Sequence, residues 1–152
     1  MSLESLYQDL LLDHSKRPVG RGLAEETPLS ASSHQRNPVC GDEITLRARV
    51  DGAGNLAEVT WEGSGCSVSQ ASASMLTALV RELVAEDAAS REEITTLIDG
   101  FREALRSRGT TPIPEEVYGD AAALSGVAKY SARVKCAMLA WVALEDALAR
   151  LA

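Results

Sequence analysis

The sequence is poor in aromatic residues and cysteine, and it contains no long apolar run. Only 4% of its 152 residues are aromatic although 45% are hydrophobic, which is ordinary for a globular chain rich in Ala and Leu. No segment approaches the roughly 18 consecutive apolar residues that a membrane span needs. Because this length is typical of one domain with a real core, we expect a single domain over residues 1–152.

Positive charge is also in short supply. The chain has 15 Lys and Arg against 22 Asp and Glu, a net charge of −7. Nucleic-acid binding needs clustered basic residues to neutralise phosphates, so nucleic acid is not an expected partner. The first 18 residues carry acidic side chains among leucines and lack a basic n-region and a small-residue cleavage site, so they do not resemble an export signal. We therefore expect a cytoplasmic protein that does not bind membranes.

Cysteine is limited to three widely separated residues, Cys40, Cys66 and Cys136, without any CxxC pair. An odd number at such spacings is unlike the disulfide framework of a small secreted protein, so reduced thiols are expected. A single free cysteine is most often a small buried hydrophobe. Composition alone leaves that interpretation open for each of the three.

Two further absences exclude common kinds of chemistry. The small-residue run at positions 67–74 lacks the Gly-Lys of a phosphate loop, which argues against nucleotide binding and favours close packing. The chain has only two histidines, and neither is tied to a cysteine by sequence, so a thiol hydrolase ranks last. We expect His14 to complement the dipole at the end of a helix and His34 to be solvated in a loop.

What is present predicts an α+β fold. Helical spacing of leucines predicts an N-terminal helix that ends near Pro18 and Gly20, and the polar segment 29–42 is expected to be a loop. Alternating apolar residues predict strands at 44–50 and 57–62, joined by the turn residues DGAGN. These strands should form a small antiparallel sheet with helices packed on one face.

Three further helices follow from apolar residues at helical spacing, at 68–83, 94–105 and 134–148. The first can be capped by Ser64 or Ser67, and the second has Ser90 and Glu93 at capping-box spacing. A short Ala-rich turn at 120–124 precedes the last. Trp61 and Trp141 are expected in the core.

The predicted elements place the cysteines at positions suited to chemistry. Cys40 lies on a loop shaped by Pro38 and Gly41, while Cys66 and Cys136 lie near helix N-termini, where the helix dipole favours a thiolate. With Asp42, two residues after Cys40, three sulfurs and one carboxylate could form a tetrahedral zinc site. The spacing alone does not decide between such a shared site and separate thiols.

Four segments resemble the IscU-like family of iron–sulfur cluster assembly proteins, whose members are similar to the NifU N-terminal domain. They are LYQDLLLDHSKRPVGRG, NPVCGD, GSGCSVSQASASM and RVKCAMLAW, and together they extend over nearly the whole chain. The resemblance implies an IscU/SufU-like fold. It also implies that four residues converge on one exposed metal site: Cys40, Asp42, Cys66 and Cys136.

Two features are similar to the SufU branch of that family: Lys135 stands where cluster scaffolds carry His, and extra helical sequence is inserted around residues 85–115. Ser131 departs from the family's expected Pro. The branch implies a zinc-dependent sulfurtransferase that takes persulfide sulfur on a catalytic Cys40. Its partners would be a SufS-type cysteine desulfurase, which holds its own pyridoxal phosphate, and downstream iron–sulfur assembly proteins.

Arg133 and Lys135, next to Cys136, are expected to stabilise the charge of the metal site or to contact the partner. Two other functions use the same residues. One is a scaffold that assembles a [2Fe-2S] cluster on the four ligands. The other is a structural zinc-binding interaction module without a sulfur-transfer role.

Overall fold

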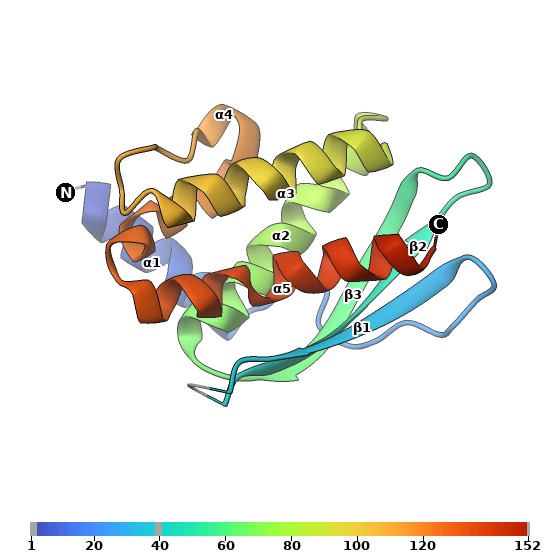
Figure 1. The fold of residues 1–152 in the computed structure, drawn as a ribbon, viewed down its shortest axis with the longest axis horizontal. Helices are drawn as coiled ribbons and strands as arrows, with labels where there is room; N and C mark the ends of the chain where they lie inside the picture. The colour runs from blue at the N-terminus through green and yellow to red at the C-terminus, as the bar shows by residue number, and fades with distance from the viewer. Residues whose placement is uncertain (1–2, 39–40, 152) are drawn as a thin grey trace.

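A computed structural model of the chain describes residues 3–38 and 41–151, with side chains from residue 7 onward at the N-terminal end. It contains the predicted mixture of helices and strands (Figure 1). In chain order the elements are α1 (Leu3–Lys16), β1 (Ser30–Arg36), β2 (Glu43–Val50), β3 (Leu56–Ser64), α2 (Ser67–Ala85), α3 (Arg91–Arg106), α4 (Glu115–Tyr118), the 3-10 helix η1 (Gly119–Lys129) and α5 (Ser131–Arg150).

The three strands form one antiparallel sheet in the order β1-β2-β3. The predicted hairpin is confirmed: Leu46 faces Trp61, and the DGAGN turn joins β2 to β3. Helix α5 packs on β1 and β2, while α2 packs on β3, so the helices cover one face of the sheet as expected (Figure 1). The predicted α+β architecture is therefore confirmed.

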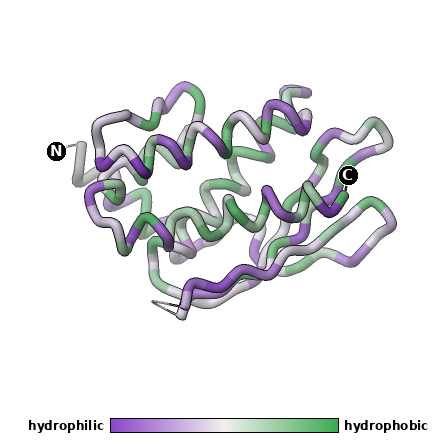
Figure 2. The backbone as a smooth tube through the Cα atoms, in the orientation of Figure 1, coloured by the Kyte–Doolittle hydropathy of each residue, from purple (hydrophilic) through white to green (hydrophobic). Residues whose placement is uncertain are grey.

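The prediction of a loop at 29–42 is wrong over half of its length, because β1 occupies Ser30–Arg36. This strand has no apolar alternation, and its second half is hydrophilic (Figure 2). Its inward residue Ser33 is only 2% exposed and donates a hydrogen bond to Asp146 of α5 at 2.7 Å. A hydrogen bond thus replaces the hydrophobic contact that sequence patterns detect in strands.

The helix caps agree only in part with prediction. Ser90 caps α3, and its hydroxyl accepts a hydrogen bond from the Glu93 N–H, as the capping-box spacing indicates. At α2 the N-cap is Cys66, in extended geometry, and neither Ser64 nor Ser67 holds that position. The short turn expected at 120–124 is a longer 3-10 helix, η1.

The core lies between the sheet and the helices, with both tryptophans buried as predicted. The rings of Phe101 and Trp141 stack with centroids 3.8 Å apart, and the Trp141 indole N–H donates to Ser72. Small serines of α2 fill the space beside this stack, since Ser72 and Ser74 are fully buried. Among the helices described, none is both long and apolar enough to cross a membrane.

From the sequence we expected His14 only to complement the dipole at the end of α1, but the structure also gives it two side-chain partners. It is 7% exposed, with Nδ1 2.6 Å from the Ser74 hydroxyl and Nε2 2.9 Å from an Asp120 carboxylate oxygen. The same Ser74 hydroxyl accepts a hydrogen bond from the Val19 N–H. His14 therefore joins α1 to α2 and η1. His34 is exposed, as expected, but lies on β1 and not in a loop.

Candidate metal centre

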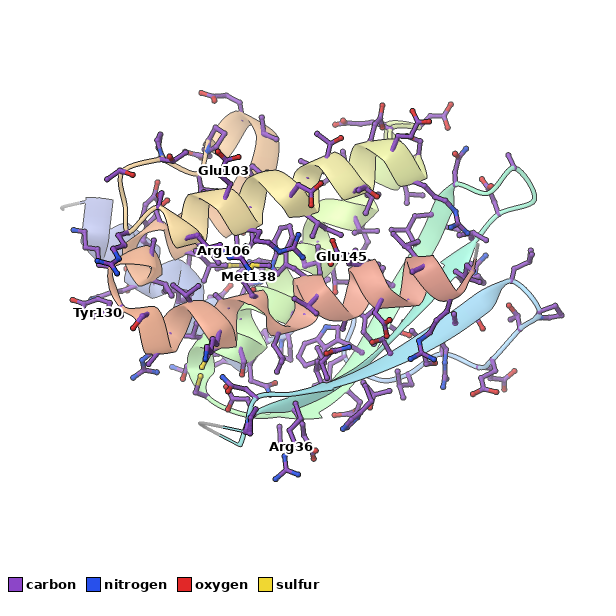
Figure 3. The ribbon with its side chains drawn as sticks, viewed as in Figure 1. Arg36, Glu103, Arg106, Tyr130, Met138 and Glu145 are labelled. Carbon is purple, nitrogen blue, oxygen red and sulfur yellow. The ribbon has the colours of Figure 1, made fainter. Side chains whose placement is uncertain are left out.

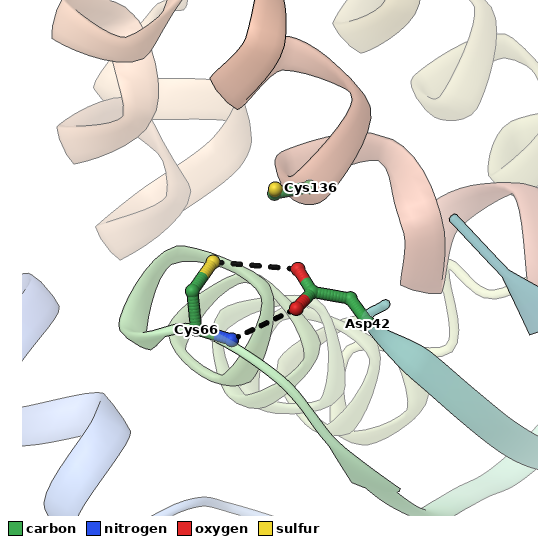
Figure 4. A group of neighbouring side chains, drawn as sticks. All are labelled: Asp42, Cys66 and Cys136. Atoms are coloured by element: carbon green, nitrogen blue, oxygen red, sulfur yellow. Dashed lines mark hydrogen bonds between the residues drawn. The ribbon is translucent and has the colours of Figure 1, made fainter. Parts of the chain in front are cut away.

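Three elements bring predicted ligands together at one end of the sheet (Figure 4). Asp42 immediately precedes β2, Cys66 is the N-cap of α2, and Cys136 lies in the second turn of α5. The antiparallel pairing of Glu43 with Ser64 sets the start of β2 beside the end of β3, where the chain turns into α2. Strand register thus brings Asp42 to Cys66 across 24 residues of sequence.

The ligand atoms of Asp42, Cys66 and Cys136 all lie within 4.8 Å of one another. One Asp42 oxygen accepts a hydrogen bond from the Cys66 backbone N–H at 3.0 Å, and the other accepts from the Cys66 thiol at 3.4 Å. The Cys136 thiol, which points toward this pair in Figure 4, is 3.7 Å from the Ala132 carbonyl oxygen. The carboxylate is therefore held at the N-terminus of α2, where the helix dipole stabilises negative charge.

The loop before Asp42 is closed by its own backbone. The Asn37 N–H donates to the Asp42 carbonyl at 2.8 Å, and the Gly41 N–H donates to the Asn37 carbonyl at the same distance. Gly41 has φ +74°, which a residue with a side chain rarely adopts. The predicted shaping role of Gly41 is confirmed. Val39 and Cys40 lie outside the described residues, so the role of Cys40 stays a prediction.

Gly65 has a role that sequence reasoning missed. A Cβ atom on Gly65 would lie 2.6 Å from an Asp42 carboxylate oxygen and 2.6 Å from the Ser69 hydroxyl oxygen. These separations are far below van der Waals contact, so a side chain at position 65 would displace the Asp42 carboxylate and the Ser69 hydroxyl. In the sequence, the glycine immediately before Cys66 in the GSGC segment is the signal from which this close approach could have been predicted.

Burial differs among the site residues. Asp42 and Cys136 are each 3% exposed, while Cys66 is partly exposed. The described part of the group is thus more enclosed than the exposed site that the family resemblance implied. Arg133 and Lys135 are both exposed on the first turns of α5, so their positive charges face solvent near Cys136. Their predicted roles in partner contact or charge stabilisation are not tested by this arrangement.

The donor set fits a zinc ion. Zinc–sulfur bonds of about 2.3 Å place two ligand atoms of a tetrahedral site roughly 3.8 Å apart, so the observed group needs to contract by only about 1 Å. Two thiols and a carboxylate are ligands that zinc accepts. Zinc binding would release the proton of the Cys66 thiol. A fourth ligand is required for a closed site.

A three-stranded antiparallel sheet covered on one face by helices, with a Cys, Cys and Asp group at one end, defines a small α+β domain with a candidate metal centre. The family described as NifU-like N terminal domain matches residues 6–137. The chain belongs to this family.

Two relatives match almost the full chain. It is 36% identical to the "Zinc-dependent sulfurtransferase SufU" of Bacillus subtilis over 98% of this chain and 93% of that protein. It is 37% identical to the "Iron-sulfur cluster assembly scaffold protein IscU" of Streptococcus pyogenes over 97% of this chain and 86% of that protein. These matches confirm the IscU-like and SufU-like resemblance.

Among solved structures, the chain is similar to a putative iron–sulfur cluster assembly scaffold protein for the SUF system from Fervidobacterium islandicum. The TM-score is 0.69 at 27% identity, and the alignment covers 97% of this chain and 99% of that one. The IscU/SufU-like fold expected from the sequence is confirmed.

Proposed function

We propose that this protein acts in iron–sulfur cluster assembly as a zinc-dependent sulfurtransferase, accepting sulfur on Cys40 from a SufS-type cysteine desulfurase. The observation that carries the proposal is the group of Asp42, Cys66 and Cys136 in a chain that is similar to a zinc-dependent sulfurtransferase over almost its full length. Downstream iron–sulfur assembly proteins would receive the sulfur.

The site residues have two proposed roles: three of them hold the zinc ion, and Cys40 also accepts the sulfur. Cys66 and Cys136 belong to helices, and Asp42 is fixed by the Cys66 N–H, so these three can hold a zinc ion with little movement. Cys40 would be the fourth ligand, from the loop that Asn37 and Gly41 close. When bound, zinc keeps its thiol ligands deprotonated at neutral pH and supplies no redox chemistry of its own.

The sulfur transfer is a thiol–persulfide exchange. The Cys40 thiolate attacks the outer, sulfane sulfur of the desulfurase persulfide, forming a new S–S bond on Cys40. The S–S bond of the desulfurase breaks, and its cysteine leaves as a thiolate with the bonding electron pair. No net oxidant or reductant is consumed, because one persulfide replaces another. Cys40 is assigned to this step because the sequence predicts it on a loop, whereas Cys66 and Cys136 belong to helix starts.

The charges near the site are also consistent with a zinc ion bound by thiolates. Three thiolates and one carboxylate carry more negative charge than one zinc ion neutralises, and Arg133 and Lys135 are exposed nearby to offset it. These two residues can also meet acidic groups of the desulfurase. The chemistry requires reduced cysteines, so we expect the protein to act in the cytoplasm.

A cluster scaffold is the second function to consider, because the Streptococcus pyogenes relative carries that name. The same ligands would then hold a [2Fe-2S] centre, which is brown and contains iron. Purification without oxygen, followed by metal analysis, separates the two: the sulfurtransferase proposal requires colourless protein with zinc near stoichiometry.

The test of function is desulfurase turnover. Adding the zinc-loaded protein to a SufS-type desulfurase and cysteine should raise the rate of alanine formation, and Cys40→Ser should abolish that increase. The zinc content of the variant is measured alongside, so that metal loss is not mistaken for loss of the acceptor. A structural zinc module would leave turnover unchanged, and that result would reject the proposal.

A further inference from the structure

A groove of about 660 Å³ lies between α3 and α5, closed at one end by η1 and the residues after α3. Its floor is apolar and includes Leu105, Val134, Met138 and Val142. Figure 3 shows Arg106 and Met138 in this space between the two helices. The last three floor residues follow one another at intervals of four along α5 and so form a stripe roughly 12 Å long.

The wall of the groove is basic. Five of the chain's 15 Lys and Arg residues line it, although the whole chain carries a net charge of −7. Arg102 at one end is neutralised by ion pairs with Asp99 and Glu145. The other four form no ion pair in the part of the chain that the structure describes: Arg106, Arg108, Lys129 and Lys135.

The backbone at Arg108 makes this residue a useful probe of the wall. Arg108 directly follows the C-cap Ser107 of α3 and has φ +58°, a left-handed conformation that usually selects glycine at this position. An arginine there is sterically less favourable than a glycine, so the charge at this position can be removed without adding backbone strain. The side chain faces the groove that it lines.

The groove and the candidate metal centre occupy different faces of α5. Cys136 and Met138 are two residues apart, which turns their side chains about 200° from each other around the helix axis. A segment lying on Met138 would therefore leave Cys136 uncovered. The groove offers a second docking surface beside the candidate metal centre, and Lys135 is the residue that lies next to both.

We propose that this groove binds an acidic, amphipathic helical segment of a partner protein. Apolar side chains of the segment would pack on the stripe along α5, and its carboxylates would pair with the unpaired cations of the wall. A small anion would use the cations but would not need the apolar floor. The proposal goes beyond sulfur transfer on Cys40, and peptide binding can be measured without a desulfurase.

The probe is a fluorescent helical peptide with Leu at helical spacing and Glu and Ala elsewhere, titrated into the zinc-loaded protein. A shuffled peptide of the same composition, with its Leu residues spread around the helix, is the matched control. The wild-type protein should bind the striped peptide saturably and more weakly at high salt. The shuffled peptide should bind about threefold or more weaker, as expected for losing one half-buried apolar contact.

Charge reversal tests the wall. The double variant Arg106→Glu/Lys129→Glu should weaken binding about tenfold, because two exposed attractions become repulsions. Arg81→Glu, which alters an exposed arginine outside the groove, should change it less than about twofold. If the double variant binds like the Arg81 control, the groove is not the docking site.

Arg108→Gly separates a binding role from a structural one. It should weaken peptide binding about threefold by removing one charge pair, yet its melting temperature should be no lower than that of the wild-type protein, because glycine relieves the left-handed strain. A lower melting temperature with unchanged binding would overturn the assignment. Equal binding of striped and shuffled peptides, or displacement of the peptide by inorganic phosphate, would show an anion site only and would also overturn it.

Discussion

At the scale of single residues, the candidate metal centre depends on groups that are not themselves ligands. Gly65 leaves room for the Asp42 carboxylate, and the Cys66 N–H fixes its orientation. Neighbours that position metal ligands commonly change metal affinity by about 10- to 100-fold when they are altered. The positions around the cysteines therefore matter as much as the thiols.

Gly65→Ala tests this directly. The added methyl group would overlap the Asp42 carboxylate and the Ser69 hydroxyl, so the carboxylate must move away from Cys66. We expect zinc affinity to fall by at least about tenfold in a chelator competition. Gly52→Ala is the matched control, because no atom lies within 4 Å of the Cβ added there. Equal zinc affinity of the two variants would show that Asp42 does not contribute to metal binding.

The Ser33–Asp146 hydrogen bond gives a pH-dependent prediction. The Ser33 hydroxyl and, next, Arg150 hold the pKa of Asp146 below its usual value. A lowered pKa in the folded state contributes stability above the ordinary Asp pKa of about 3.9, and that stability is lost as pH falls through the folded-state pKa. Ser33→Ala should raise the pKa of Asp146 and destabilise the protein at neutral pH, with a smaller difference in acid.

Urea unfolding over a range of pH measures that difference, and NMR titration of the Asp146 carboxyl measures its pKa. In an Asp146→Asn background, the effect of Ser33→Ala should no longer depend on pH, because the titrating group is gone. A pH-dependent effect that persists in this background would assign the stabilisation to another group.

At the scale of helices and strands, α1 is joined to the rest of the fold through a buried histidine. His14→Ala would remove both the Ser74 and the Asp120 interactions and leave the buried Ser74 hydroxyl with fewer partners. We expect a loss of about 2 kcal/mol in the free energy of unfolding, measured in urea. Because His14 is not part of the Asp42, Cys66 and Cys136 group, zinc content should be retained.

The chain provides a matched control in its other histidine. His34 is exposed, so His34→Ala should cost less than about 0.5 kcal/mol. If the two variants have the same stability, His14 does not hold α1 in place.

The sequence predicted those helices and strands in which buried apolar residues recur at regular intervals. The β2–β3 hairpin and the buried face of α3 from Ile94 to Leu105 were predicted because apolar residues mark their inner faces. Strand β1 was missed because its buried contact is the Ser33 hydroxyl, a polar group. Hydrogen bonds between distant segments carry no periodic signal.

The same limit applies to the candidate site. Cysteine position, loop shape and family resemblance indicated Asp42, Cys66 and Cys136, which the structure brings together. The close approach of Gly65 to Asp42 depends on the strand register between Glu43 and Ser64, which one sequence does not reveal. The assignment of Cys40 rests on sequence and chemistry.

At the scale of the whole molecule, charge is distributed unevenly. The chain is acidic overall, yet four cations that form no ion pair among the described residues gather on the groove between α3 and α5. Helix α3 lies in the range 85–115 that we interpret as an insertion, and this interpretation and the single domain over residues 1–152 stay predictions. The candidate metal centre and the proposed docking surface thus lie on different sides of α5.

The central claim is that Cys40 accepts the sulfur, and mass spectrometry after incubation with a cysteine desulfurase and cysteine tests it most directly. We predict one added sulfur atom on the peptide that contains Cys40, and none on that peptide when the desulfurase is omitted. An added sulfur found on Cys66 or Cys136 instead would contradict the account.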